Sequence, residues 1–201
     1  MMGLMMIAEE TKQKIIDVAD TRFRRYGFGK TTMVEIAKDC RMSAANLYRY
    51  FESKEKIGVE IALKCLRHKE KMGEAVLERA GLSASERLTT FFLEILRYTH
   101  DLCANDPHLF ELVAFISREH QGIVQQHRSS LQDFISKILI EGHETGTFDI
   151  DDVASTAGTI LFATIHFYYP PLVSMTGLTL DELEQHAKEV VDLLIRGLAR
   201  H

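Results

Sequence analysis

The chain has 201 residues, 46% of them hydrophobic and 26% charged, and a net charge of −5 at pH 7. This length allows one or two domains with a substantial core. Only three prolines interrupt the hydrophobic pattern, which favours an all-α fold. No run of eighteen apolar residues occurs, so we expect no membrane-spanning helix. Three scattered cysteines without CxxC spacing predict reduced thiols in a cytoplasmic protein, namely Cys40, Cys65 and Cys103.

The first eight residues, MMGLMMIA, are apolar but lack a basic leader, so we expect a mobile tail and no signal peptide. A helix is predicted from about Ala8 to Tyr26. Gly27 should end this helix in a left-handed conformation, and Phe28 should then fold back on its last turn. One face of the helix repeats apolar residues at helical spacing: Ile15, Ala19, Phe23 and Tyr26.

Residues 30–56 predict two short helices joined by a tight turn. Thr32 followed by Glu35 forms a capping box, so the first helix should run from Met33 to about Cys40. Arg41 and Met42 form the turn. A compact second helix after so short a turn is the arrangement that places a helix in the major groove of DNA.

Ser43 is placed to cap the second helix, which we predict from Ala44 to Phe51. Leu47 and Phe51 lie four residues apart and form its buried side. The first turn holds only small residues, so the end of this helix can come close to a nucleic acid.

These residues resemble the DNA-binding region of the TetR family of transcriptional regulators over about 50 residues, from Ile7 to Lys56. The chain differs from the family pattern at Arg41-Met42, where Gly-Val is common, and at Ala44-Ala45. The matching positions are Gly27, Thr31-Thr32, Ile36-Ala37, Ser43, Leu47-Tyr48-Arg49-Tyr50-Phe51 and Ser53-Lys54-Glu55. The resemblance implies an all-α protein with a three-helix helix-turn-helix domain and a larger C-terminal helical domain.

The resemblance also implies double-stranded DNA as a partner. Lys54 is carried over as a contact to the DNA backbone, because a lysine at a helix start is unfavourable unless a phosphate lies there. We expect phosphate contacts from Thr32, Tyr48, Tyr50 and Lys54, and base contacts from Ala45, Asn46 and Arg49. Ala44 completes the predicted DNA-contact set.

The charge distribution agrees with this assignment. Residues 1–56 hold 11 basic and 8 acidic residues, a net charge of +3. Residues 57–201 hold 13 basic and 21 acidic residues, a net charge of −8. The basic excess therefore lies where the DNA-binding helices are expected.

We predict a boundary at residue 56, with a DNA-binding domain over 1–56 and a ligand-binding and dimerisation domain over 57–201. A long helix should start at Lys54 and continue to Gly81, weakened by Gly58 and Gly73. Later helix starts are predicted at the capping boxes Ser83/Glu86 and Thr179/Glu182, at Asp106-Pro107, and at Asp149. The helix that Asp149 caps should extend over 150–169. Its second half should be buried on several sides, and Pro170-Pro171 should end it.

The last helix carries an apolar stripe that is predicted to pair across a two-fold axis together with part of 153–167. The family resemblance implies this homodimer, and two DNA-reading helices give useful specificity. Packing within the same chain is the alternative. The stripe consists of Leu183, Val190, Val191, Leu194 and Leu198.

A small-molecule effector in the C-terminal domain is also implied by the resemblance. A mixture of aromatic residues with polar tips suits an apolar or aromatic ligand, although aromatic residues at helical spacing also form cores. Whether the effector releases DNA or promotes its binding stays open. The candidate wall consists of Phe92, Ile95, Tyr98, Phe110, Phe115, Phe162, His166 and Tyr169, with His166 expected to be buried.

The sequence contains no GxSxG, P-loop or GxGxxG pattern, so no enzyme activity and no cofactor are expected. Cys65/His68 and His100/Cys103 are each three residues apart but do not make a complete zinc site. The alternative function is a helical small-molecule-binding or metal-sensing protein that does not read DNA.

Overall fold

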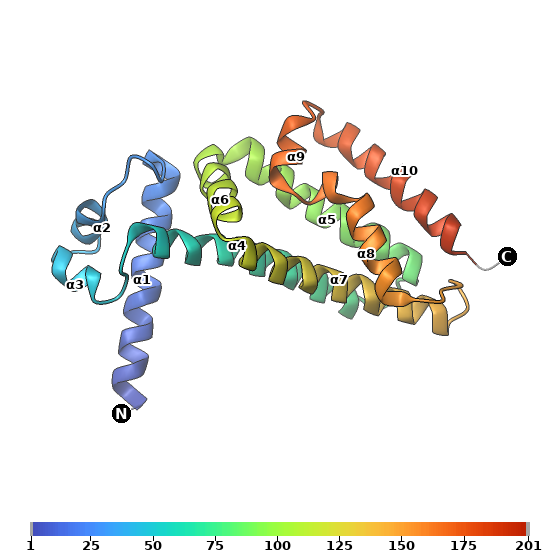
Figure 1. Ribbon diagram of the computed structural model, residues 1–201, viewed down its shortest axis with the longest axis horizontal. Helices are drawn as coiled ribbons and strands as arrows, with labels where there is room; N and C mark the ends of the chain where they lie inside the picture. The colour runs from blue at the N-terminus through green and yellow to red at the C-terminus, as the bar shows by residue number, and fades with distance from the viewer. Residues whose placement is uncertain (1, 200–201) are drawn as a thin grey trace. The chain divides into compact units, whose positions relative to one another are not determined.

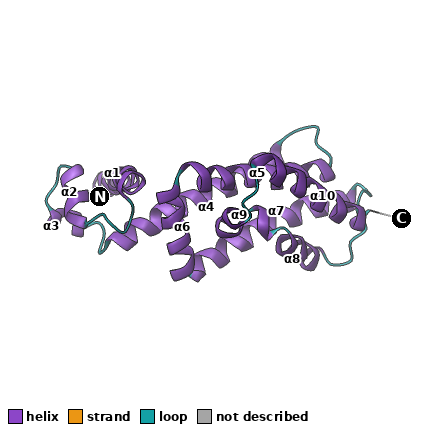
Figure 2. Cartoon of the chain, turned by 90° about the horizontal axis from the view of Figure 1, so that it is seen from above, coloured by secondary structure: helices purple, strands orange, loops and turns teal. Residues whose placement is uncertain are grey.

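The computed structural model describes residues 2–199, with side chains from residue 6 onward, and within this range the chain is helical without a β-strand (Figures 1 and 2). An isolated antiparallel bridge joins Phe148 and Ala199. The helices are α1 Met2–Tyr26, α2 Met33–Asp39, α3 Ala44–Tyr48, α4 Lys54–Glu78, α5 Ala84–Asn105, α6 Pro107–Glu119, α7 Gln121–Glu144, α8 Val153–Ala163, the 3₁₀ turn η1 Ile165–Phe167, α9 Pro170–Met175 and α10 Leu180–Leu198.

The chain forms two compact units, and each includes part of α4. The first unit comprises residues 2–65 and 106–120, and the second comprises 66–105 and 121–199. The first unit therefore extends beyond the predicted boundary at residue 56, because α6 packs on α1 and Gly58 on α4 lies against Leu112 of α6. None of the helices in the described range is long and apolar enough to cross a membrane.

The first unit has a core built on the predicted face of α1. Ile15, Ala19 and Phe23 are fully buried, and the Phe28 ring meets the Phe23 ring edge-on at 5.2 Å between centroids. Gly27 has φ of 85°, which confirms the predicted left-handed end of the helix. The helix starts at Met2, however, so the prediction of a mobile tail before Ala8 is wrong: methionine, leucine and alanine are good helix formers.

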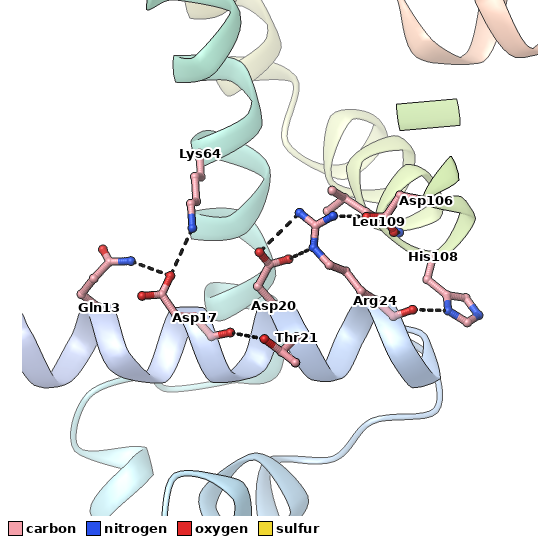
Figure 3. Close-up of polar contacts among 9 residues, drawn as sticks. All are labelled: Gln13, Asp17, Asp20, Thr21, Arg24, Lys64, Asp106, His108 and Leu109. Atoms are coloured by element: carbon pink, nitrogen blue, oxygen red, sulfur yellow. Dashed lines mark hydrogen bonds and ion pairs between the residues drawn. The ribbon is translucent and has the colours of Figure 1, made fainter. Parts of the chain in front are cut away.

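Polar contacts join α1 to α4 and α6 within the first unit (Figure 3). Arg24 forms ion pairs with Asp20 and with Asp106, which caps α6. His108 Nδ1 lies 2.8 Å from the carbonyl oxygen of Arg24, and Lys64 on α4 lies 3.1 Å from Asp17. These contacts hold α6 against α1, the helix that braces the DNA-reading segment.

The second unit is organised around α5, which packs against α7, α9, η1 and α10. Phe91 and Phe92 lie in its core with the α7 residues Leu131 and Ile135. Arg87 is buried, and its guanidinium donates to the carbonyl oxygens of Val76 and Leu77 at 2.7 and 2.9 Å. The end of α4 is thus capped by a cation, which a helix C-terminus favours.

The glycines of α4 are points of close packing. A Cβ at Gly58 would lie 3.0 Å from Leu112, and one at Gly73 would lie 2.9 Å from Phe134. The sequence indicated only that these residues weaken the helix. The structure shows that α4 is continuous from Lys54 to Glu78 and that the missing side chains let neighbouring residues approach.

The segment before α8 differs from the prediction. Asp152, and not Asp149, caps the helix by accepting from the Ser155 amide at 3.0 Å. The Asp149 amide instead donates to the Leu198 carbonyl at 2.8 Å, so residues 148–149 stay extended.

The end of α8 also differs from the prediction. The Thr164 hydroxyl donates to the Ile160 carbonyl, and the chain then tightens into η1. The predicted helix over 150–169 is therefore interrupted, and Phe162 and His166 are exposed, contrary to the expected burial.

Candidate nucleic-acid interface

The helix-turn-helix starts with the predicted capping box. The Thr32 hydroxyl accepts from the Glu35 amide at 3.3 Å. The Thr32 hydroxyl and the Thr32 amide both donate to the Glu35 carboxylate at 2.8 Å. The two hydrogen bonds to the carboxylate, first from the hydroxyl and then from the amide, lower the pKa of Glu35 below its ordinary value. Thr32 stays exposed at the N-terminus of α2, where we predicted a phosphate contact.

The turn between α2 and α3 closes with two backbone hydrogen bonds. The Met42 amide donates to the Ala37 carbonyl, and the Arg41 amide donates to the Lys38 carbonyl. This is the Schellman arrangement, which places Arg41 at the position that glycine usually occupies. Arg41 has φ of 58° and is the one non-glycine residue with positive φ in the described chain. The Gly-Val pair typical of the family is thus replaced at the cost of backbone strain.

Helix α3 is short and, with the two residues that follow it, holds most of the predicted DNA-contact residues. The Ser43 hydroxyl accepts from the Asn46 amide at 3.1 Å, which confirms the predicted cap. Ala45, Tyr48 and Arg49 are exposed, whereas Ala44, Asn46 and Tyr50 are half-buried. Leu47 and Phe51 are buried, as predicted.

The structure ends α3 at Tyr48 and not at Phe51, because the Tyr50 amide donates to Leu47, three residues back, and tightens the last turn.

Arg22 on α1 fixes the orientation of α2. Its guanidinium forms ion pairs of 2.7 Å with both Glu35 and Asp39, and its side chain is mostly buried. Because Glu35 also belongs to the capping box, the same carboxylate joins the start of α2 to α1. Helical spacing does not indicate these ion pairs, because Glu35 and Asp39 lie 13 and 17 residues from Arg22.

Lys54 lies at the start of α4 with its ammonium bonded inside the unit. Nζ donates to the carbonyl oxygens of Phe28 at 2.6 Å and Thr31 at 2.8 Å. Burial lowers the pKa of this ammonium, and the Glu35 carboxylate opposes the shift. These two carbonyl groups offset the unfavourable position of the charge at a helix start. From the sequence, we expected only a DNA phosphate to do so.

The predicted ligand-wall residues are divided between the two units. Phe110 and Phe115 lie on α6 in the first unit, where Phe115 packs 5.4 Å from the Phe28 ring. Phe92 and Ile95 are fully buried in the core of the second unit. Tyr98 and Tyr169 are half-buried in that unit, whereas Phe162 and His166 are exposed.

Two cavities are lined by other residues. A groove of about 780 Å³ runs along α1, with acidic and basic side chains such as Glu10, Lys14 and Arg25. A smaller cavity of about 160 Å³ lies in the second unit between α5 and α9, with Cys103 and Val173 in its wall. Among the described residues, no three His, Cys, Asp or Glu side chains gather as a metal site.

The apolar stripe of α10 packs largely within its own chain. Leu183 and Val191 are 2% and 1% exposed, so these two side chains are not available at the surface of the single chain, which corrects their predicted place in an interface. Val190, Leu194 and Leu198 are partly buried against the core of the second unit. Leu193 on α10 and Phe162 on α8 are both 71% exposed.

Comparison with protein families gives two matches. Residues 15–61 match the model described as "Bacterial regulatory proteins, tetR family". Residues 84–191, more than half of the chain, match the model described as "Tetracyclin repressor-like, C-terminal domain". The matched ranges include the helix-turn-helix and most of the second unit.

Individual relatives agree with the family matches. The chain is 26% identical over 154 residues to the uncharacterised HTH-type transcriptional regulator YhgD of Bacillus subtilis, covering 76% of this chain and 79% of that protein. It is 44% identical over 54 residues to IcaR of Staphylococcus aureus, the negative transcriptional regulator of the biofilm operon icaADBC, covering 27% of this chain and 28% of that protein.

The solved structure of a transcriptional regulator from Cytophaga hutchinsonii shares the fold with a TM-score of 0.73 at 20% identity, covering 92% of this chain and 97% of that one. A capped helix-turn-helix, a helical second unit and matches to both TetR family models agree. The chain is a member of the TetR family of transcriptional regulators.

Proposed function

We propose that this chain is a homodimeric repressor that binds a palindromic operator and is released from DNA by a small, mainly apolar or aromatic effector. The observation that carries the proposal is the helix-turn-helix, in which α3 exposes Ala45 and Tyr48, and its C-terminal cap Arg49 is also exposed, beside a short, fixed turn. IcaR, which resembles this chain over its DNA-binding region, is named a negative regulator and supports repression.

The proposed DNA contacts follow from exposure and side-chain chemistry. Arg49 is exposed and presents donors that match a guanine edge, and Asn46 matches an adenine edge. Ala44 and Ala45 allow close approach of α3 to the groove. Thr32, Tyr48 and Tyr50 are proposed to bind phosphates, and Lys54 adds a positive charge beside them.

The proposed dimer uses the surfaces of α8 and α10. Leu193 and Phe162 each leave a large apolar side chain mostly in solvent in the single chain, and burying such side chains drives association. Two copies would then present two α3 helices to half-sites about one helical turn, or a multiple of it, apart.

Selection of bound duplexes from a random DNA pool by the purified protein tests the proposal. We expect enrichment of one inverted repeat. Arg49→Ala should lose about 1–3 kcal/mol of affinity and relax preference at one base pair of each half-site. The control Lys12→Ala changes an exposed lysine of α1 away from α3 and should enrich the same repeat. Absence of any enriched sequence from folded protein, with and without cell extract, would contradict operator binding.

A further inference from the structure

A buried ammonium lies in the second unit. Lys69 on α4 is 3% exposed, and its Nζ donates to the Tyr168 carbonyl oxygen at 2.8 Å. The same Nζ lies 5.9 Å from the centre of the Tyr98 ring. Transfer of an ammonium from water into a protein interior is costly unless acceptors surround it, and the Tyr168 carbonyl is one such acceptor.

A buried histidine lies close to this lysine. His127 on α7 is 8% exposed, and its Nδ1 lies 3.0 Å from a carboxylate oxygen of Glu70, the neighbour of Lys69 on α4. Its Nε2 is buried without a hydrogen-bond partner in the structure. Unpaired buried nitrogens of this kind are uncommon and indicate a missing partner.

The electrostatics define the protonation state of His127. Burial lowers the pKa of the imidazole, the hydrogen bond to Glu70 raises it, and the Lys69 charge lowers it, with a net decrease. The ring is therefore neutral near pH 7, and the Glu70 carboxylate selects the tautomer that carries hydrogen on Nδ1. This tautomer leaves Nε2 as a bare acceptor near a fixed positive charge.

The small cavity between α5 and α9 lies close to this charge. Cys103 lines the cavity, and the Lys69 charge also acts on the Cys103 thiol, whose pKa burial raises. Val173 and Leu178 give the cavity an apolar wall. Its volume of about 160 Å³ is similar to that of a cavity that holds one benzene molecule.

We propose that Lys69 and His127 bind the carboxylate of a small organic acid whose apolar body lies toward the Cys103 cavity. The inference rests on the proposed function, because it names the chemical class of the effector. Lys69 supplies the charge, His127 donates from Nε2, and Glu70 holds the imidazole ring in place.

Binding of the carboxylate takes up a proton. The acid is already ionised at pH 7, and the proton comes from solvent to Nε2, giving an imidazolium between Glu70 and the bound anion. The other titratable groups around the cluster and the cavity are His68 on α4, Tyr98, His100 and Cys103 on α5, Arg128 on α7 and Tyr168 after η1. Arg128 and Lys69 are the basic groups of this cluster and favour a bound anion.

Isothermal titration of the full chain with benzoate and hexanoate, and with benzamide and hexanamide, tests this proposal. We expect saturable binding of at least one acid and at least tenfold weaker binding of its neutral amide. Titration in buffers of different ionisation enthalpy should show uptake of about one proton per acid bound.

Two variants assign the site. Lys69→Met keeps the length of the side chain and removes its charge, and His127→Asn keeps a donor near Glu70 but removes Nε2. Each should weaken acid binding by about tenfold to a hundredfold, and His127→Asn should also abolish proton uptake. The controls Lys71→Met and His143→Gln change exposed residues on the same two helices and should bind like the wild type. Far-UV circular dichroism establishes that each variant is folded.

Equal binding of acids and amides, no binding of either acid at millimolar concentration, or unchanged binding by both folded variants would each overturn the inference. The titration contains no DNA, so its result is independent of the duplex selection. An enriched inverted repeat without acid binding rejects this effector class alone, whereas acid binding without an enriched repeat rejects the DNA-binding proposal alone.

Discussion

The ammonium of Lys54 packs over the ring of Phe28 while it bonds to the backbone of the same residue. Nζ lies 4.4 Å from the ring centre and 2.6 Å from the Phe28 carbonyl oxygen. Phe28 in turn packs on Phe23 in the core of the first unit. The start of α4 is thereby fixed to the loop that leads into α2, so Lys54 acts on the geometry of the helix-turn-helix as well as on its charge.

Lys54→Met should therefore reduce both stability and DNA binding. Loss of two charge-assisted hydrogen bonds should lower the free energy of unfolding by about 1–3 kcal/mol, measured by urea denaturation. Loss of one positive charge should lower the salt dependence of DNA binding by about one unit on a double-logarithmic plot. Lys56→Met removes an exposed lysine two residues further along the chain and should leave stability unchanged; equal destabilisation by both variants would contradict the bracing role.

Arg41→Gly should stabilise the protein. The positive φ at this position costs a residue with a side chain about 1 kcal/mol, which glycine does not pay. Arg41→Ala keeps the strain and should not stabilise the protein. Both variants remove an exposed charge from the turn and should weaken binding to all DNA sequences alike. Thermal denaturation and duplex titration separate the two effects, and stabilisation by alanine would contradict the strain explanation.

Gly142→Ala and Gly122→Ala should have opposite effects on the same helix. A Cβ at Gly142 would lie 2.0 Å from the Phe148 ring, so alanine should displace that buried ring and destabilise the protein by about 1–3 kcal/mol or more. A Cβ at Gly122 meets nothing within 4 Å, and alanine there should stabilise α7 by up to about 1 kcal/mol. Urea denaturation measures the free energy of unfolding of both variants. An unchanged stability of Gly142→Ala would contradict this prediction and show that Phe148 has room to move.

Stability should fall as the pH drops below the ordinary histidine pKa of 6.5, because burial lowers the pKa of His127 in the folded state. Between the lowered value and 6.5 the unfolded chain binds more protons than the folded chain, so acid favours unfolding in that window. The lowered carboxylate pKa values, for example that of Glu184 beside Arg97, affect stability only below about 4.5. Melting temperatures from pH 7.5 to 5 should fall less in His127→Asn than in the wild type, and parallel curves would contradict this assignment.

Leu193→Glu should convert the proposed dimer to monomer. The side chain is 71% exposed in the single chain, so a charge there leaves the core of the unit intact but is costly in an apolar interface. Light scattering during size-exclusion chromatography measures the mass. Gln185→Glu adds the same charge at an exposed position of the same helix and serves as the control. A monomeric wild type, or a dimeric Leu193→Glu, would contradict the proposed interface.

The sequence by itself determined the local structure around the DNA-reading segment. The capping boxes at Thr32 and Thr179, the Ser43 cap and the left-handed Gly27 form as predicted, because each depends on side chains and backbone groups within a few residues. The buried face of α1 follows from spacing for Ile15, Ala19 and Phe23, whereas Tyr26, the fourth residue of the predicted face, is 43% exposed.

Only the tertiary structure decided which side chains meet across helices. Lys54 donates to carbonyl groups 23 and 26 residues away, and His127 meets Glu70 across 57 residues; helical spacing contains no information about such pairs. The apolar second half of the predicted helix over 150–169 indicated burial, yet Thr164 ends the helix early and Phe162 is exposed. Periodicity predicts which face of a helix is apolar. Long-range packing decides where that helix stops and what its apolar face contacts.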